Sequence, residues 1–150
     1  MDTLLVEKQT TNIQEEFLPL NGTDFIELYV GNAKQSAHFY KTAFGFQSLA
    51  YSGLETGNRE CASYVLRQGK ITLILTTPYN SSSPVAEHIK NHGDGVKVIA
   101  FTVDDAEYSF AQTTERGAEP FLFPTVKSDA DGEIKIAGIK TYGEVIHLFV

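Results

Sequence analysis

Two histidines four residues apart are the pair whose type and spacing most directly suggest chemistry. His88 and His92 lie in the stretch AEHIKNHGDGVK. On a helix, side chains at this spacing share one face, and such pairs form half of many zinc sites. Zinc proteases place a glutamate directly after the first histidine, whereas this chain has Ile89 there. A third ligand is also missing nearby, so we interpret the stretch as the end of a surface helix whose histidines face solvent and bind no metal.

Three other features suggest chemistry, and each has a simpler explanation. DADGE (129–133) resembles a calcium loop, but the twelfth position counted from Asp129 is Lys140, where an EF-hand needs glutamate. We therefore predict a hairpin turn there. Cys61 is the single cysteine, which excludes an internal disulfide, and it has no histidine close in sequence. GDG (93–95) lacks the spacing of a phosphate loop. We predict no catalytic, cofactor-binding or metal-binding residue in the chain.

Composition and charge exclude several classes of partner. The chain has 12 lysines and arginines against 19 aspartates and glutamates, a net charge of −7. Such a chain is a poor ligand for nucleic acid and for anionic membranes. We find no signal peptide at the N-terminus and no apolar run that could span a membrane. A single cysteine favours a reducing compartment, so we expect a soluble cytoplasmic protein.

Alternating and helical patterns predict the elements of the first half of the chain. DFIELYV (24–30) alternates as a strand does. A helix follows, with Asn32 as its N-cap and Gly45 as its left-handed stop. A second strand comes next, and residues 61–78 form a hairpin that turns near Gly69. The expected buried stripe of the helix consists of Ala33, Ala37, Tyr40 and Phe44.

The same order of elements then restarts, after a short helix capped by Ser83 and ended by Gly93. VIAFTV (98–103) is a strand, and Asp104 or Asp105 caps the next helix. Aligning the halves places Phe25 on Val98, Ile26 on Ile99 and Val30 on Val103, while GKITLIL overlies GEVIHLF. The chain is therefore predicted to be an internal duplication in which each half is a βαβββ unit.

The predicted organisation is one domain preceded by a tail. Residues 1–19 form a polar tail, and 20–150 form a single two-repeat domain. Repeat one covers about 24–78, a linking helix about 83–93, and repeat two about 96–150.

The order of elements and several phrases resemble the vicinal oxygen chelate superfamily, which includes glyoxalases, bleomycin-resistance proteins and extradiol dioxygenases. The phrases are AHFYKTAFGFQSLAY and VIAFTVDDAE. Longer stretches, among them FLPLNGTDFIELYVGNAKQSAHFYKTAFGFQSLAY, ASYVLRQGKITLILTTP and IKTYGEVIHLFV, resemble the N-terminal half of the 4-hydroxyphenylpyruvate dioxygenase family over about residues 17–150. The implied fold is α+β, with tandem βαβββ repeats that form an incompletely closed, eight-stranded, barrel-like sheet with helices outside.

This resemblance also implies a function. Enzymes of that family are Fe(II) dioxygenases that convert 4-hydroxyphenylpyruvate and O2 to homogentisate and CO2 in tyrosine catabolism. They hold iron with two histidines and a carboxylate in a C-terminal module. The resemblance therefore implies that this chain is the non-catalytic N-terminal domain, with no cofactor of its own and no activity alone. Its expected partners are the C-terminal catalytic module of the same protein and further copies in a homo-oligomer.

The superfamily places metal ligands at four positions, which correspond here approximately to Phe25, Leu73, Val98 and His147. Only His147 can bind a metal, and a site of two histidines and one carboxylate needs three donors. A shift in register would bring Glu27 closest, still without a partner in the second half. We interpret His147 as a satisfied core or cavity residue.

Two alternatives belong to other functional classes. A free-standing metalloenzyme such as a glyoxalase would need donors where Phe25 and Val98 stand. A free-standing small-molecule-binding protein of the bleomycin-resistance type would need a cavity in the sheet. Its candidate lining residues are Tyr29, Tyr51, Tyr64 and Phe101, although aromatic residues at strand spacing also build cores.

Overall fold

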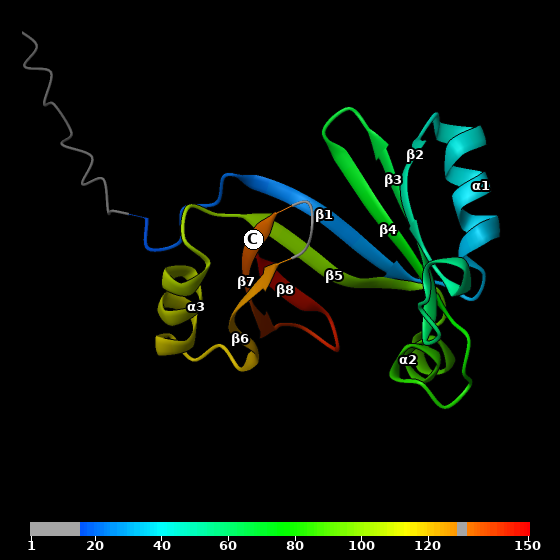
Figure 1. Cartoon of the computed structure of the whole chain (residues 1–150). Helices are drawn as coiled ribbons and strands as arrows, with labels where there is room; N and C mark the ends of the chain where they lie inside the picture. Colours follow the sequence, from blue (N-terminus) through cyan, green and yellow to red (C-terminus); the bar gives the residue numbers. More distant parts are fainter. Residues whose placement is uncertain (1–15, 129–131) are drawn as a thin grey trace, which may run out of the picture.

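Eight strands form one mixed sheet in the computed structural model, which describes residues 16–128 and 132–150 (Figure 1). The elements are β1 (Gly22–Tyr29), α1 (Ala33–Phe44), β2 (Gln47–Ser52), the 3-10 helix η1 (Leu54–Thr56), β3 (Cys61–Gln68), β4 (Ile71–Pro78), α2 (Pro84–His92), β5 (Gly95–Thr102), α3 (Ala106–Glu115), β6 (Pro120–Ser128), β7 (Glu133–Lys140) and β8 (Ile146–Phe149).

The strand order shows the internal duplication directly. It runs β2-β3-β4-β1-β5-β8-β7-β6, so the halves mirror each other about β1 and β5. β1 is parallel to β4 as β5 is parallel to β8, and the remaining pairs within each half are antiparallel. β1 and β5 pair antiparallel and join the halves. β2 and β6 are the two edges, which confirms the predicted α+β fold with an incompletely closed eight-stranded sheet.

The first helix begins and ends where the sequence predicts. The Asn32 side chain accepts a 3.0 Å hydrogen bond from the Gln35 amide, and Gly45 ends the helix at φ 76°. Ala33 and Ala37 are buried as expected. Phe44, expected on the buried stripe, is 56% exposed, because the helix ends there and its ring contacts Phe39 and Tyr40 instead of the core.

Two hydrophobic clusters lie under the helices, one in each half. The first packs α1 against strands β3 and β4, and its buried members are Val30, Ala33, Ala37, Phe46, Leu66, Leu73 and Leu75. The second packs α3 against β7 and β8, and its buried members are Ala106, Phe110, Ala137, Ile139 and Phe149. α1 therefore covers the first half of the sheet and α3 the second, and the two helices lie at opposite sides of the molecule in Figure 1.

Caps also define α2 and α3. The Ser83 hydroxyl accepts from the Ala86 amide, and Pro84 occupies the first turn, where its missing N–H costs nothing. Of the two aspartates expected to cap α3, Asp105 does so, accepting from the amides of Glu107 and Tyr108 at 2.9 and 3.1 Å. Asp104 instead accepts from the side-chain amide of Asn21 at 2.7 Å.

Some predictions fall on residues 1–15 and 129–131, which lie outside the described part of the chain. They include most of the polar tail 1–19 and the turn within 129–133. The limits of the tail and of the two-repeat domain stay predictions. Within the described residues, every helix is too short or too polar to cross a membrane.

Candidate functional site

The four superfamily ligand positions do not gather donors in this chain. Leu73 belongs to the hydrophobic cluster under α1. Val98 is buried and pairs with Glu27 on β1 and with Ile146 on β8. Phe25 pairs with Ala100 on β5. Among residues 16–128 and 132–150, neither His147 nor Glu27 belongs to a group of three potential metal ligands. The residues present therefore do not fit an iron ion at these positions.

His147 lies among rings. It contacts Phe101 edge-on at a centroid distance of 5.1 Å and Tyr142 at 6.0 Å. Its Nε2 is buried and has no hydrogen-bond partner among the described residues. The expectation of a satisfied histidine is therefore wrong. Burial lowers the pKa of His147 below its usual value, because the protonated ring loses solvation that no partner replaces.

Glu27 is a partly buried carboxylate on the sheet face opposite α1. Its neighbours Ile26 and Leu28 pack on the cluster under α1, so alternation directs Glu27 to the other face. The Thr76 hydroxyl donates to Glu27 Oε1 at 2.7 Å and lies 2.9 Å from the Ser63 hydroxyl. Burial raises the pKa of Glu27, and the Thr76 hydrogen bond opposes this only in part.

Tyr29 lies two residues along the same strand. Burial first, then the nearby charges of Glu27 and Cys61, raise the pKa of Tyr29 to about 12. The four aromatic residues considered as a cavity lining form separate ring contacts: Tyr29 with His88, Tyr51 with Tyr64, and Phe101 with His147. Tyr64 also packs against the hydrophobic cluster under α1. These contacts assign Tyr64 to the core and not to a shared pocket.

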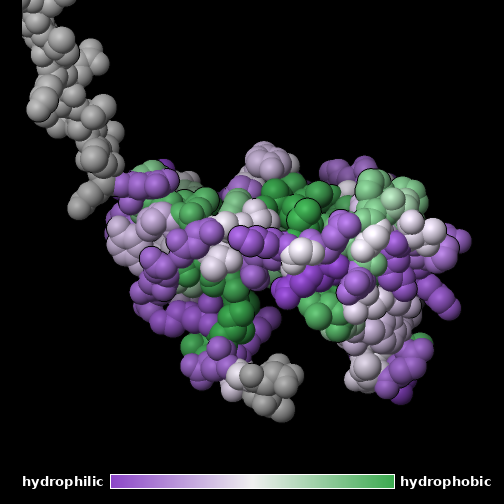
Figure 2. Space-filling model, turned by 90° about the horizontal axis from the view of Figure 1, so that it is seen from above, coloured by the Kyte–Doolittle hydropathy of each residue, from purple (hydrophilic) through white to green (hydrophobic). Residues whose placement is uncertain are grey.

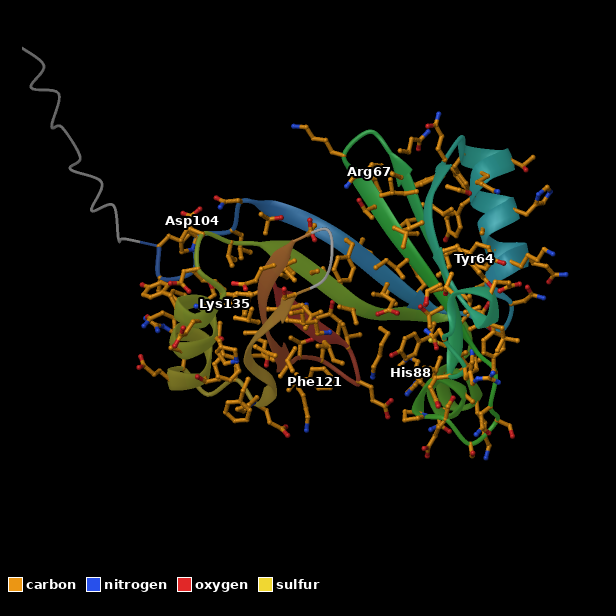
Figure 3. The ribbon with its side chains drawn as sticks, viewed as in Figure 1. Tyr64, Arg67, His88, Asp104, Phe121 and Lys135 are labelled. Atoms are coloured by element: carbon orange, nitrogen blue, oxygen red, sulfur yellow. The ribbon has the colours of Figure 1, made fainter. Side chains whose placement is uncertain are left out.

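His88 and His92 meet a carboxylate from the other half of the chain. Oε2 of Glu144, in the turn between β7 and β8, lies 3.1 Å from His88 Nδ1 and 3.3 Å from His92 Nε2. The His88 side chain is only 7% exposed, so the prediction that it faces solvent is wrong. Figure 3 labels His88 at α2. It is buried because α2 packs on β1 and β4 and the Tyr29 ring meets the imidazole edge-on at 5.5 Å. His92 is 45% exposed.

The electrostatics of this cluster favour an ionised Glu144. Hydrogen bonding to His88 contributes most, His92 and Lys97 add to it, and together they hold the pKa of Glu144 below its usual value. Lys97 also donates from Nζ to the Glu144 backbone carbonyl at 2.6 Å, which fixes the turn against β5. We define His88, His92 and Glu144 as the two-histidine cluster.

A second feature is the apolar surface of the β6 edge. The exposed large hydrophobic side chains on β6 and its neighbour β7 are Phe121, Phe123, Val126 and Ile134. Phe123 is 66% exposed, although its ring contacts Phe110 of α3. A cavity of about 310 Å³ lies between Phe121, Lys97, Lys140 and residues 143–146. Figure 2 shows hydrophobic groups set among hydrophilic ones on one face of the molecule.

Comparison with known proteins identifies the family. Residues 15–150 match the family described as hydroxyphenylpyruvate dioxygenase, N-terminal. The chain belongs to this family. Members of the hydroxyphenylpyruvate dioxygenase family to which it is similar include 4-hydroxyphenylpyruvate dioxygenases of Danio rerio, 46% identical over 126 residues, and of Coccidioides posadasii, 43% identical over 142 residues. The first alignment covers 83% of this chain and 32% of the relative, the second 86% and 36%. The chain thus spans about a third of these relatives.

Solved structures agree with this family. A mutant of 4-hydroxymandelate synthase from Streptomyces coelicolor superposes with a TM-score of 0.83 at 32% identity, covering 89% of this chain and 39% of that one. Methylmalonyl-CoA epimerase from Mycobacterium tuberculosis gives a TM-score of 0.70 at 17% identity, with 90% of each chain covered. The second likeness shows the vicinal oxygen chelate fold alone.

Sequence reasoning missed the partner of the two histidines. Glu144 is 56 residues from His88, and nothing local indicates the pairing. The signal was indirect: the internal repeat predicts that β5 and β8 are parallel neighbours, and α2 leads directly into β5. The turn before β8 therefore had to lie near the end of α2.

Proposed function

We propose that this chain is the non-catalytic N-terminal domain of a 4-hydroxyphenylpyruvate dioxygenase. Its task is to pack against the C-terminal catalytic module and to contribute to oligomer contacts. The parent enzyme converts 4-hydroxyphenylpyruvate and O2 to homogentisate and CO2 in the cytoplasm, as a step of tyrosine catabolism. The Fe(II) of that reaction is held by the C-terminal module.

The match of residues 15–150 to the N-terminal part of the family carries this proposal. It is supported by the chemistry of the four superfamily ligand positions, since Phe25, Leu73 and Val98 have no lone pair to give a metal. A domain of this family that lacks those donors is suited to support catalysis and not to perform it.

The β6 edge is the surface we assign to packing. Edge strands with exposed aromatic side chains invite pairing with another chain or module. Phe121 and Phe123 are two residues apart on β6, and both are exposed. At the opposite edge, β2 exposes one large hydrophobic side chain, Leu49.

Two measurements test the proposal. The purified chain supplied with Fe(II), 4-hydroxyphenylpyruvate and O2 is expected to form no homogentisate. Mixed with a separately produced catalytic module of the parent, it is expected to form a complex detectable by size-exclusion chromatography with light scattering. Phe123→Asp should weaken that complex about tenfold or more, because it places a charge in an apolar contact.

Leu49→Asp, at the other edge of the sheet, is the matched control and should leave binding unchanged. Homogentisate production by the chain alone would overturn the non-catalytic assignment. Absence of any complex, together with a thermal shift on adding aromatic acids, would instead favour a free-standing binding protein of the bleomycin-resistance type.

A further inference from the structure

We propose that the two-histidine cluster is a binding site for a divalent transition metal of the zinc class. His88, His92 and Glu144 would be its three protein ligands. The sequence alone argued against this because the third donor was missing, and the fold supplies it. This inference does not depend on the proposed function of the chain.

The donor atoms already lie close to coordinating geometry. Zinc binds imidazole nitrogen and carboxylate oxygen at about 2.0–2.2 Å, so ligand atoms in a tetrahedral site are about 3.3 Å apart. Glu144 Oε2 lies 3.1 Å from His88 Nδ1 and 3.3 Å from His92 Nε2, and the three donor atoms all lie within 4.8 Å of one another. The distance that still has to adjust is the one between the donor nitrogens of His88 and His92, and the exposed His92 ring can rotate to change it.

Two of the three ligands are held in place by contacts that do not use the donor atoms. The buried His88 ring is fixed edge-on against Tyr29. The backbone of Glu144 is fixed by Lys97, and the Thr141 hydroxyl donates to the Val145 carbonyl at 3.1 Å within the same turn. Such preorganisation lowers the entropic cost of assembling a site.

The ligand set fits zinc and its neighbours better than hard cations. Imidazole suits Zn²⁺, Ni²⁺ and Co²⁺, whereas Mg²⁺ and Ca²⁺ prefer all-oxygen sites. Three protein ligands leave a fourth position for water on the solvent side, where His92 and Glu144 are 45% and 52% exposed.

Protons compete with the metal for the same lone pairs. In the metal-free chain His88 Nδ1 and His92 Nε2 both face Glu144 Oε2, so a proton on either nitrogen occupies the lone pair that a metal would need. The other groups that face the cluster are Lys97 from β5, whose positive charge opposes a cation, and Tyr29 from β1. Binding should therefore weaken on acidification, because the imidazoles and the carboxylate must be deprotonated at the atoms that bind the metal.

A bound metal would cross-link the repeats. His88 and His92 belong to α2, which follows the first repeat and packs on β1 and β4, whereas Glu144 belongs to the second repeat. The metal should therefore raise the melting temperature of the folded chain by mass action, since the unfolded chain does not hold the three ligands together.

The test is calorimetric titration of the untagged, chelator-treated chain with ZnCl2, supported by the absorption spectrum of the Co²⁺ complex. We expect one metal per chain and d–d bands stronger than those of aqueous Co²⁺, which indicate a coordination number below six. His92→Gln and Glu144→Gln remove exposed ligands, so the fold should be retained. Each is expected to weaken binding at least about tenfold.

The matched control is His38→Gln, which removes an exposed histidine on α1. It should bind zinc as the wild type does. Failure of the wild type to bind one equivalent would overturn the proposal. So would a loss of binding in His38→Gln equal to that in the cluster variants, or full binding by either His92→Gln or Glu144→Gln.

Discussion

The Thr76 hydroxyl donates a 2.7 Å hydrogen bond to Oε1 of Glu27, so a polar contact links β4 to β1 on the face opposite α1. Ser63 extends the contact to β3 through its hydroxyl. Burial raises the pKa of Glu27 by more than the hydrogen bond from Thr76 lowers it. The stability of the chain should depend on the protonation of Glu27.

We expect Glu27→Gln to stabilise the chain at neutral pH. The folded state raises the pKa of Glu27, so its stabilising contribution is complete below the unfolded value near 4.5 and is lost as the pH rises through the folded value. Gln is neutral throughout and keeps an oxygen for Thr76. Urea unfolding should show a gain at pH 7 that shrinks towards pH 4. The exposed strand variant Glu133→Gln should show no such trend, and an equal gain at both pH values would contradict this account.

His147→Leu should flatten the acid side of the stability profile. Burial lowers the pKa of His147 in the folded state, so on acidification through about 6.5 the unfolded chain takes up a proton that the folded chain does not. The free energy of unfolding of the wild type therefore decreases as the pH decreases, and Leu removes this contribution. It also removes the unsatisfied Nε2. Unfolding free energies between about pH 5 and 7.5 measure the slope, and His38→Gln should leave it unchanged.

Removing the cap of α3 should cost about 1 kcal/mol. The Asp105 side chain accepts hydrogen bonds from two amides of the first turn, which Ala cannot replace. Chemical denaturation of Asp105→Ala checks the value, and Asp105→Asn should recover most of it. Asp104→Ala loses only an exposed contact to Asn21 and should cost less. A larger loss from Asp104→Ala would reverse our assignment of the cap.

Gly138→Ala should destabilise the second repeat by about 1–3 kcal/mol through overpacking. A Cβ at this position would lie 2.6 Å from Leu148 Cδ2 and 3.3 Å from the His147 carbonyl oxygen. Gly95→Ala is the matched strand control, because its Cβ would meet nothing within 4 Å. The melting temperature of the control should stay close to that of the wild type. Similar losses in both variants would point to strand glycines in general and not to crowding.

Local chemistry made most of the fold predictable. The caps at Asn32 and Ser83 and the stop at Gly45 depend on residues within one helical turn, so the sequence determines them directly. The internal repeat then fixed the order of elements. Phe44 was misplaced because helical periodicity extends a stripe up to the last residue, whereas the core under α1 ends one turn earlier.

The candidate sites were less predictable, because they depend on contacts between the halves. The burial of His88 comes from β1 and β4, and its carboxylate partner comes from the turn before β8. Periodicity on α2 could not reveal either contact. Glu27 was recognised as the nearest carboxylate, but its hydrogen bond to Thr76 required the parallel pairing of β1 with β4.

The antiparallel pair β1 and β5 has a consequence for how such a chain can be divided. Within the described residues, β1 and β5 form the one strand pairing between the halves, and each of these strands has eight residues. Because the two strands run in opposite directions and occupy equivalent places in their repeats, we expect either half to pair with a copy of itself across the same edge. A gene cut between α2 and β5 would thus yield two fragments able to reassemble by complementation, each also capable of forming a symmetric dimer.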